Sequence, residues 1–542
     1  MPFLAKEHVP IPKKDLISWI FDDIGYDSDM PVYIDAADPS KSISARQARS
    51  MIRRLVAGFH SAGLQKGDAV CVHSFNNLYY PITVLGIIGA GCVYTGTNPA
   101  YTPRELTHHI SVTKAKLFLV EPELLSPVLE AMKRSSIDSS KVFLFDPYSQ
   151  QNSELPSWQS LLDHGEQDWV RFEDENESKN TTAMRLTTSG TTGLPKAAEL
   201  SHHNLVSQHT LVWESQIPKK PYDLRTIIAL PMFHAAMAPM VHTSALRSGF
   251  VMHLMRKFDV DEFMAAIHKY RPTEIMVVPP VVLRIVMSPN VKNYDFSCLK
   301  RATVGAAPLD PDLQQRFENL IDGAVTQVWG MTESSCVISM TPYPESGLAT
   351  VGYLLPNHDI KFVNDNGEEI LESNVPGEMC VRGPNIIRGY FNDPVANSRD
   401  FDADGFYHSG DVGYIEKSTG KLYIVDRKKE LIKVRGFQVA PNEIEGILLS
   451  HPSIIDAAVI GLSLPSSPDA ELVQARVVLR EGDELSEREV LDYVQPQLAS
   501  YKHLTGGVKF VPTIPKTASG KILKRLLREE ALREIKAETA KL

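Results

Sequence analysis

The stretch LTTSGTTGLPKA, residues 186–197, gathers hydroxyl side chains, glycines and one lysine into a short segment. The glycines allow positive φ, so successive backbone N–H groups can turn inward and bind an anion. The pattern therefore predicts a polyphosphate-binding loop, although a flexible surface turn is the alternative for this composition alone. It differs from the common nucleotide loop because two residues separate its second glycine from the lysine. The phosphate-binding candidates are Ser189, Gly190, Thr191, Thr192, Gly193 and Lys196.

Seven further blocks follow this loop along the chain. They are LPMFH (230–234), VGAAPL (304–309), QVWGMTES (327–334), GEMCVRGP (377–384), YHSGDVG (407–413), VDRKKELIKVRGFQVAPNEIE (425–445) and PKTASGKILK (515–524). In this order the eight blocks resemble the adenylate-forming superfamily of acyl- and aryl-CoA synthetases, luciferase and peptide-synthetase adenylation domains. The chain looks closest to the 4-coumarate–CoA ligase and luciferase-like branch, and the resemblance covers nearly its whole length.

The resemblance implies an AMP-forming acyl-CoA synthetase that uses ATP, Mg²⁺ and coenzyme A. A carboxylate is a poor electrophile because its oxygen is a poor leaving group, and joining it to AMP makes a mixed anhydride that reacts far more readily. That step needs in-line attack on the α-phosphate, with the surrounding charge neutralised. A thiol then displaces AMP. We expect the acid to be aryl or medium-chain.

Adenine and ribose contacts are implied by the resemblance residue by residue. The small residues of the turn, Gly305, Ala306 and Ala307, would let the backbone lie against a flat adenine. Asp411 would bind the ribose hydroxyls, and Arg427 would contact ribose or phosphate. Taken singly, Asp411 could instead cap a turn. The other nucleotide-site candidates are Gln327, Trp329 and Gly330, of which the tryptophan is by default a core residue.

Phosphate and metal contacts are assigned to the next block. Thr332 would hold the α-phosphate, and Glu333 would bind Mg²⁺, because Mg²⁺ typically takes one or two carboxylates together with phosphate oxygens. A single glutamate in a loop is otherwise a solvated side chain. Only the ordered set of blocks favours the functional interpretation.

A mobile lysine completes the predicted catalytic set. Lys521 follows Gly520, and by composition alone it is an exposed lysine near the C-terminus. By resemblance its ammonium bridges the carboxylate and the α-phosphate, where it stabilises the crowded transition state. It must withdraw before a thiol can enter, and the family does this by rotating its C-terminal domain about a hinge, here residues 426–429.

By resemblance, this rotation presents the other face of the C-terminal domain to the same site, and coenzyme A contacts are expected there. Lys433, Arg435 and Gly436 would line the thiol entrance, with Gly436 allowing close approach of the pantetheine arm. Lys257 aligns with a lysine that contacts the coenzyme nucleotide in coumarate ligases, and surface charge is its alternative. Lys429, in the hinge, is a further cofactor candidate.

The acid pocket departs from the coumarate ligase pattern. His234, Ala236, Ala306 and Met331 are the substrate-binding candidates, with His234 also a catalytic candidate. Coumarate ligases carry tyrosine where this chain has Ala236, and glycine where it has Val328. Small and soft residues predict a roomy apolar pocket.

The elements that must position these residues follow an alternating pattern. Thr102-Pro103-Arg104-Glu105 begins a helix, AKLFLV (115–120) is a strand, and the runs 274–277 and 301–304 are similar short strands. The apolar run 82–96 favours a buried helix leading into a strand, and EDENES (173–178) a solvated loop. Such alternation predicts an α/β fold of packed, multi-layered sheets, to which the resemblance adds a small β-barrel-like subdomain.

The composition changes after LYIV (422–425). The remaining residues contain a helix opened by Pro441, the strands IIDAAVIG and LVQARVVL, and a helix capped at Ser486. We therefore expect residues 1–425 to form the N-terminal adenylation domain, 426–429 the hinge and 430–542 a mobile α+β lid domain. A chain of 542 residues is long enough for two or more domains.

Charge and targeting signals narrow the partners. The formal net charge of −10 argues against a nucleic-acid partner, and no apolar run is long enough to span a membrane. Five scattered cysteines fit a reducing compartment. Ala540-Lys541-Leu542 matches the peroxisomal address, which predicts binding to the import receptor, with the cytoplasm as the alternative location.

Two other functions stay open at this point. The chain could load a carrier protein as a stand-alone adenylation enzyme, although the coenzyme-contact candidates argue against it. It could also be a luciferase-like oxygenase of its own adenylate, for which the sequence gives no positive sign.

Overall fold

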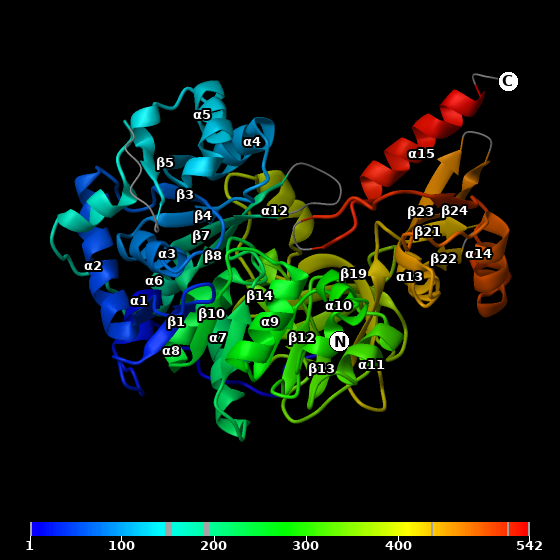
Figure 1. The fold of residues 1–542 in the computed structure, drawn as a ribbon, viewed down its shortest axis with the longest axis horizontal. Coiled ribbons are helices and arrows are strands. Elements are labelled where there is room, and N and C mark those ends of the chain that lie inside the picture. Colours follow the sequence, from blue (N-terminus) through cyan, green and yellow to red (C-terminus); the bar gives the residue numbers. More distant parts are fainter. Residues whose placement is uncertain are drawn as a thin grey trace.

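The computed structural model describes residues 3–146, 154–188, 195–434, 437–464, 467–517 and 520–539. Some predicted site residues lie outside these ranges: Ser189, Gly190, Thr191, Thr192, Gly193, Arg435, Gly436 and Ala540-Lys541-Leu542. Figure 1 shows a large body and, at one end of it, a smaller C-terminal domain that we call the lid domain (β21 to α15). The predicted combination of a large N-terminal α/β domain with a smaller α+β domain is confirmed.

Three sheets form the main part of the body. Their strands are β1 Pro31–Asp35, β2 Ser42–Ser44, β3 Ala69–His73, β4 Val93–Gly96, β5 Ala115–Val120, β6 Val142–Leu144, β7 Thr182–Thr187, β8 Ala197–Ser201, β9 Arg225–Ile228, β10 Val251–Leu254, β11 Glu274–Val277, β12 Arg301–Val304, β13 Ala324–Met331, β14 Cys336–Met340 and β15 Tyr353–Leu354. The strand orders are β6-β5-β3-β4-β7-β8, β2-β1-β10-β9 and β11-β12-β13-β14-β15. The third sheet is parallel from β11 to β13 and antiparallel beyond.

Helices cover these sheets. In the body they are α1 Leu16–Phe21, α2 Ala45–Ser61, α3 Tyr80–Gly89, α4 Pro103–Thr113, α5 Leu125–Arg134, α6 Glu175–Asn180, α7 His202–His209, α8 Ala245–Ser248, α9 Val260–Tyr270, α10 Pro279–Val286, α11 Pro311–Glu318 and α12 Pro394–Asp400. The predicted helix start is confirmed, because Thr102 and Glu105 form a reciprocal capping box on α4. The apolar run 82–96 is, as predicted, a buried helix leading into a strand. Among the described residues, no helix is long and apolar enough to cross a bilayer.

One local prediction is wrong. The acidic run 173–178 is not simply a loop, because most of it belongs to α6. The Asp174 side chain accepts a hydrogen bond from the Glu177 backbone N–H and caps the helix. Acidic side chains in a first turn are stabilised by the helix dipole, so the same charges that suggested solvation also favour a helix start.

A fourth sheet of the body adjoins the lid domain. It contains β16 Asp359–Val363, β17 Glu369–Ile370, β18 Gly377–Arg382, β19 Tyr407–Ile415 and β20 Leu422–Arg427. The strands are antiparallel in the order β17-β16-β18-β19-β20. This sheet is the subdomain predicted as barrel-like, and its described pairings run from β17 to β20 without closing on themselves.

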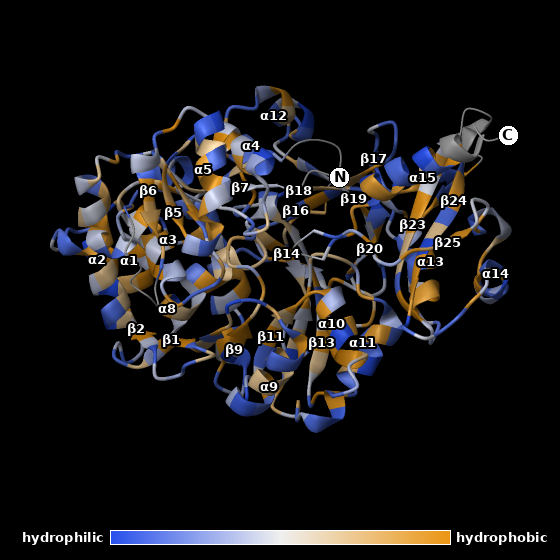
Figure 2. Cartoon of the chain, turned by 45° about the horizontal axis from the view of Figure 1, so that its top comes forward, coloured by the Kyte–Doolittle hydropathy of each residue, from blue (hydrophilic) through white to orange (hydrophobic). Residues whose placement is uncertain are grey.

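The lid domain has a core of its own. Its elements are β21 Ile432–Val434, β22 Phe437–Val439, α13 Pro441–Leu449, β23 Ile454–Leu464, β24 Ser467–Leu479, α14 Glu487–Val494, β25 Val508–Phe510 and α15 Lys524–Thr539. Ile444 and Leu448 of α13 pack with Val459 and Val473 in one buried cluster. Figure 2 shows the corresponding apolar strands β23 and β24 beside α13, separate from the apolar strands of the body.

The chain passes from body to lid domain close to the predicted hinge. Strand β20 continues through Arg427, and β21 begins at Ile432. Lys428 Nζ lies 2.9 Å from Glu378 Oε2 on β18, so the segment stays attached to the body beyond the end of β20. The predicted hinge therefore begins inside a body strand, and its role as a hinge stays a prediction.

Candidate active site

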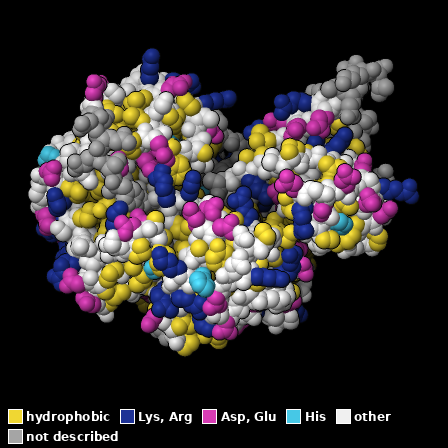
Figure 3. All heavy atoms as spheres, viewed as in Figure 1, with side chains coloured by type: hydrophobic (Ala, Val, Ile, Leu, Met, Phe, Trp, Pro, Cys, Tyr) yellow, Lys and Arg dark blue, Asp and Glu magenta, His cyan; other side chains and the backbone are white. Residues whose placement is uncertain are grey.

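A cavity of about 650 Å³ lies between the body and the lid domain. The body contributes residues from α10, β13, β19 and β20, and the lid domain contributes α13 and the segment before α15. Figure 3 shows the surface hollowed where the two parts meet. The predicted residues that line this cavity are Ala306, Ala307, Gln327, Trp329, Gly330, Asp411, Arg427 and Lys521.

Asp411 is a buried carboxylate held by two donors. Trp329 Nε1 donates to its Oδ2 at 2.8 Å, and Arg427 Nε lies 3.1 Å from its Oδ1. The register of β19 and β20 places Asp411 opposite Arg427. A carboxylate has acceptor capacity beyond two such bonds, so Asp411 can still accept from hydroxyl groups of a ligand. The Asp411 charge raises the pKa of Arg427, which stays cationic.

Lys521 enters the cavity from the lid domain. Its backbone N–H donates to Thr517 Oγ1 at 3.1 Å. Burial, together with the nearby cation Arg427, lowers the pKa of Lys521 to about 8. Most Lys521 side chains are therefore charged at neutral pH. Arg427 and Lys521 are the cations on the Asp411 side of the cavity, whereas further carboxylates, among them Asp426, Glu430 and Glu445, also line it.

The turn after β12 is shaped for close backbone approach. Ala306 has φ of 69°, a left-handed conformation that is uncommon outside glycine. Gln327 supports this turn, since its Oε1 accepts from the Leu309 backbone N–H at 2.8 Å. Its Nε2 donates to Gln314 Oε1 at 3.1 Å. Gln327, predicted to contact the nucleotide, thus uses its amide group to position the turn.

Two glycines of the predicted site are required by their neighbours. A Cβ atom on Gly330 would lie 1.6 Å from the backbone oxygen of Cys336 on the adjacent strand β14. A Cβ atom on Gly305 would lie 3.0 Å from Val328 Cγ2. Val328 therefore packs against the turn at the position where the sequence departs from coumarate ligases.

Glu333 belongs to a buried hydrogen-bonded group. Tyr390 OH donates to Glu333 Oε1 at 2.8 Å, and the hydroxyls of Tyr390 and Tyr407 lie 3.1 Å apart. Burial and the Glu333 charge raise the pKa of Tyr390, which stays a neutral donor. Thr332, next to Glu333, is partly exposed.

The donors around Glu333 bear on whether Mg²⁺ would fit. Within the described residues, no three acidic, histidine or cysteine side chains gather as a metal cage. At nucleotide sites Mg²⁺ takes one or two carboxylates, and the phosphates supply further ligands. Glu333, with one oxygen bonded to Tyr390, retains acceptor capacity for such an ion.

Lys196 lies beside the same group. Its Nζ is 2.7 Å from Asp400 Oδ2 and 3.7 Å from the centre of the Tyr390 ring. Lys196, the predicted phosphate-loop lysine, thus forms an ion pair with Asp400 of α12. It also lies over the ring of Tyr390, whose hydroxyl donates to Glu333. The glycine-rich part of the loop lies outside the described residues.

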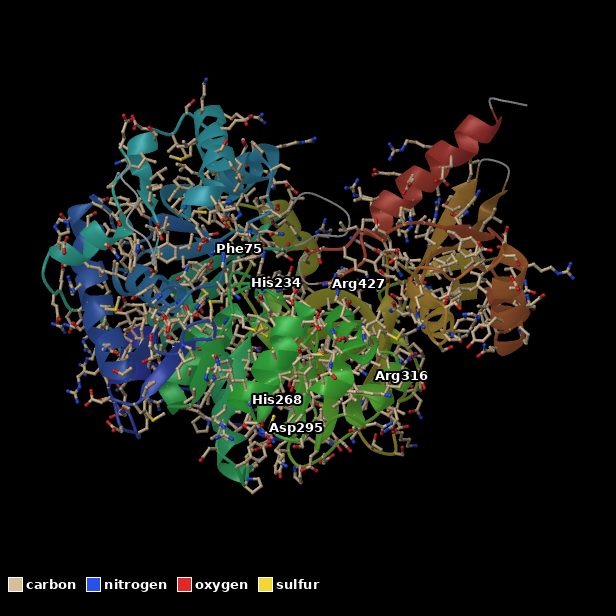
Figure 4. All side chains as sticks on the ribbon, viewed as in Figure 1. Phe75, His234, His268, Asp295, Arg316 and Arg427 are labelled. Carbon is tan, nitrogen blue, oxygen red and sulfur yellow. The ribbon has the colours of Figure 1, made fainter. Side chains whose placement is uncertain are left out.

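His234 follows Phe233, which lines a second inter-domain cavity, and is not itself among the described residues that line either inter-domain cavity. Its Nδ1 accepts from the Ala236 backbone N–H at 3.2 Å, which leaves the proton on Nε2. Burial lowers the pKa of His234 to about 4, so the ring is neutral. Figure 4 shows His234 between Phe75 and Arg427, whereas His268 and Asp295 lie lower in the same view, away from these three residues. Ala236 and Met331 are partly buried.

A second cavity, of about 860 Å³, lies between the two domains beside the first. Lys257 lines it, and so do Phe75 of the body and Lys516 of the lid domain. The other coenzyme candidates are elsewhere: Lys429 is exposed after β20, and Lys433 is exposed on β21. Neither of these two lysines is among the described residues that line the two inter-domain cavities.

Sequence reasoning missed two residues of this site, Tyr390 and Asp400. Both lie in the stretch between the blocks GEMCVRGP and YHSGDVG. Neither has a neighbour at a spacing that indicates chemistry, and each contacts its partner only through the fold. The one available signal is that Tyr390 is a tyrosine, which is compatible with a buried hydroxyl donor.

Comparison with known proteins agrees with this geometry. The model of the AMP-binding enzyme family matches residues 24–391, and that of the AMP-binding enzyme C-terminal domain matches residues 443–521. Phenylacetyl-CoA ligase epaB of Aspergillus niger is 47% identical over 98% of this chain and 99% of its own. Acyl-CoA ligase azaF, also of Aspergillus niger, is 48% identical over 97% and 100%. The crystal structure of ATP-bound MatB from Rhodopseudomonas palustris matches with a TM-score of 0.84 at 27% identity, covering 95% and 98%.

The fold and the inter-domain site define an adenylate-forming enzyme, and the chain belongs to the AMP-binding enzyme family. Within it, the chain is an acid–thiol ligase: it forms an acyl-AMP from ATP and a carboxylic acid, and transfers the acyl group to coenzyme A.

Proposed function

We propose that this ligase activates an aryl or medium-chain carboxylic acid in the cavity shared by Asp411, Arg427 and Lys521. The observation that carries the proposal is the position of Lys521. It comes from the lid domain, yet it lines the same cavity as the body residues Asp411 and Arg427. A lysine delivered by one domain to a nucleotide site on the other suits the acid-activating step.

In that step a carboxylate oxygen attacks the α-phosphorus and pyrophosphate leaves. Asp411 accepts from the ribose hydroxyls while Trp329 and Arg427 hold its carboxylate in place. The ammonium of Lys521 neutralises charge between the acid and the α-phosphate, where preorganised donors contribute most. Mg²⁺ would be held by Glu333 and phosphate oxygens, and it would neutralise charge on the leaving group.

His234 orients the acid in this proposal. Its neutral ring offers the Nε2–H to an oxygen of the carboxylate, since Nδ1 is occupied by the Ala236 N–H. A neutral donor aligns the acid without lowering the nucleophilicity of its oxygen as strongly as an imidazolium would. Met331 and Ala236 would border the acid beyond the carboxylate.

In the second step the thiol sulfur attacks the acyl carbonyl and AMP leaves. Lys257 on the wall of the 860 Å³ cavity is the body residue proposed to contact coenzyme A. Lys433, Arg435 and Gly436 belong to the lid face that would meet the thiol after rotation about residues 426–429. Of these three, Lys433 is described, and it does not line the adenylation cavity in this arrangement, which suits a role in the later step.

Two observations support the acid class. One relative is named a phenylacetyl-CoA ligase, and the cavity wall beside Val328 includes the apolar residues Val337, Met240 and Met340. The alternatives from other classes, carrier loading and oxidation of the adenylate, have no supporting contact among the described residues.

The deciding experiment is a carboxylic-acid panel with ATP and Mg²⁺, with and without coenzyme A. Pyrophosphate and thioester are scored separately. We expect acid-dependent pyrophosphate release in both arms and thioester only with coenzyme A. Acyl-AMP that reacts with a carrier protein but not with coenzyme A would favour the carrier-loading alternative. Light or CO₂ release without coenzyme A would favour the oxygenase.

Peroxisomal location is a separate proposal that rests on Ala540-Lys541-Leu542. Fluorescent fusions that keep this C-terminus free should collect in peroxisomes, through the import receptor. Deleting Leu542 should release the protein to the cytoplasm without loss of ligase activity. Import of the truncated protein would contradict the address.

A further inference from the structure

A small cavity lies behind the wall of the nucleotide site. Val328 lines both this inner cavity and the inter-domain cavity, so its side chain stands between them. The inner cavity is small, about 40 Å³. Its apolar lining includes Met240, Met276 and Met340, whose unbranched side chains change rotamer readily and can make room for a ligand.

The inner cavity runs along one face of the third sheet. Glu274 pairs with Arg301 and Met276 pairs with Thr303, so these side chains lie on one face of β11 and β12. All four line the inner cavity. Gly305 lies four residue steps after Arg301, which spans about 13 Å along a parallel strand. The cavity therefore leads from the nucleotide turn, along the sheet face, to the first residues of β11 and β12.

The far end of the cavity carries an excess of positive charge. Lys220 Nζ lies 2.6 Å from Glu274 Oε1, which also accepts from Tyr222 OH at 2.7 Å. Arg301 is 3% exposed and donates to the backbone oxygen of Thr341. Within the described part of the chain, its guanidinium makes no other hydrogen bond. Two cations thus accompany one carboxylate, and Arg301, which lines the cavity, keeps donors beyond the one bonded to Thr341.

A buried, incompletely bonded guanidinium is costly unless a ligand or solvent completes its hydrogen bonds. An ordinary structural ion pair explains the burial of Lys220 and Glu274. It does not explain why Arg301 is buried with most of its N–H donors unbonded among the described residues. The helical walls near them, Thr210–Glu214 and Met240–Ser244, are both π-helical turns, which occur frequently at functional sites.

We infer that the inner cavity is the distal part of the acid pocket, and that it selects acids with a hydrogen-bond-accepting oxygen at the end remote from the carboxylate. Arg301 is the residue that determines this selection. The inference rests on the proposed function, because the acid must be adenylated beside Gly305 for its tail to pass Val328.

The test compares acids of equal length that differ only at the far end. Decanoate is paired with 9-oxodecanoate, and 3-(4-methylphenyl)propanoate with 3-(4-hydroxyphenyl)propanoate. Pyrophosphate release gives kcat/KM for each. We expect the oxygen-bearing member to be preferred about tenfold or more, as one hydrogen bond to a charged group implies. Arg301→Met should bring the ratio close to one, and Arg301→Lys should keep part of the preference.

Butyrate and benzoate are the matched controls, because neither reaches Arg301, and both should react equally with the wild type and Arg301→Met. Should Arg301→Met fail to fold, Met276→Phe provides the second test: Met276 lines the inner cavity but not the inter-domain cavity, so a bulkier side chain there should abolish activity with both long pairs and spare the short acids. An equal loss of activity with the short acids would contradict the claim that only the long acids extend into the inner cavity.

These experiments distinguish failure of the selection by Arg301 from failure of the proposed acid-activating function. Pyrophosphate from the methyl-ended acids alone, or an unchanged preference in Arg301→Met, would overturn the selection by Arg301 and leave the proposed function standing. Absence of pyrophosphate with every acid would overturn both.

Discussion

Arg427 faces Asp411 directly across the β19–β20 ladder, with its Nε 3.1 Å from the Asp411 Oδ1. Arg427 is also the last residue of β20, and residues 428–431, of which Lys428 is held to the body by Glu378, connect it to the lid domain. The ribose site and the connection between the domains are therefore parts of one strand pair. Changes at either residue should affect both nucleotide binding and the position of the lid domain.

Lys521→Ala should reduce adenylation by about 10²–10³-fold in kcat, the range for loss of one preorganised donor. Acyl transfer from supplied acyl-AMP to coenzyme A should stay close to wild type, because Lys521 acts only in the first step. Pyrophosphate release and thioester formation measure the two steps separately. Lys417→Ala, at an exposed turn, is the control; an equal loss in both steps would contradict the role of Lys521.

Adenylation should fall as the pH rises past about 8. Lys521 is needed in its charged form, and burial with the nearby Arg427 lowers its pKa to about 8, so the charge is lost as pH passes that value. A pH profile of kcat/KM for ATP, scored as acid-dependent pyrophosphate release, reports the free enzyme. Lys521→Arg should move this limb to higher pH, and an unmoved limb would assign it to another group.

Substitutions around Asp411 should have graded effects on ATP. Asp411→Ala removes a charged acceptor and should raise the KM for ATP about tenfold to a hundredfold. Trp329→Phe removes only the N–H donor to Oδ2 and should cost a smaller factor, about fivefold. Initial rates at varied ATP give both values. An Asp411→Ala enzyme with unchanged ATP dependence would exclude the ribose role.

Tyr390→Phe should weaken metal-nucleotide binding by about fivefold to tenfold, because Glu333 loses the donor that orients its carboxylate. Tyr407→Phe is the matched control, since that hydroxyl contacts Tyr390 rather than Glu333. Mn²⁺ titration followed by paramagnetic resonance in the presence of ATP measures binding without turnover. Equal effects of the two substitutions would mean that Tyr390 acts only through packing.

Local elements were predictable where the chain carries strong local signals. The capping box at Thr102, the strand 115–120 and the strand–turn segments at 274–277 and 301–304 all appear as predicted. The order of motif blocks predicted the family, and with it the two-domain architecture. The acidic run 173–178 was wrongly predicted to be a loop, because charge favours both a solvated loop and the capped first turn of a helix.

Side-chain roles were less predictable than elements. Gln327 lines the expected cavity, yet its side-chain amide is hydrogen-bonded to Leu309 and Gln314. No sequence spacing indicates these partners. The contact from Tyr390 to Glu333 joins residues 57 positions apart. The charged end of the inner cavity depends on strand register, since Glu274 meets Arg301 only because β11 and β12 pair in parallel.

Asp456, Lys516 and Gly520 of the lid domain belong to the walls of both inter-domain cavities. A molecule long enough to occupy the two spaces at once would contact the body and the lid domain on either side of these residues. Such a compound would fasten the domains in a single arrangement. It would inhibit by arresting the catalytic cycle between its halves, even in the presence of saturating ATP.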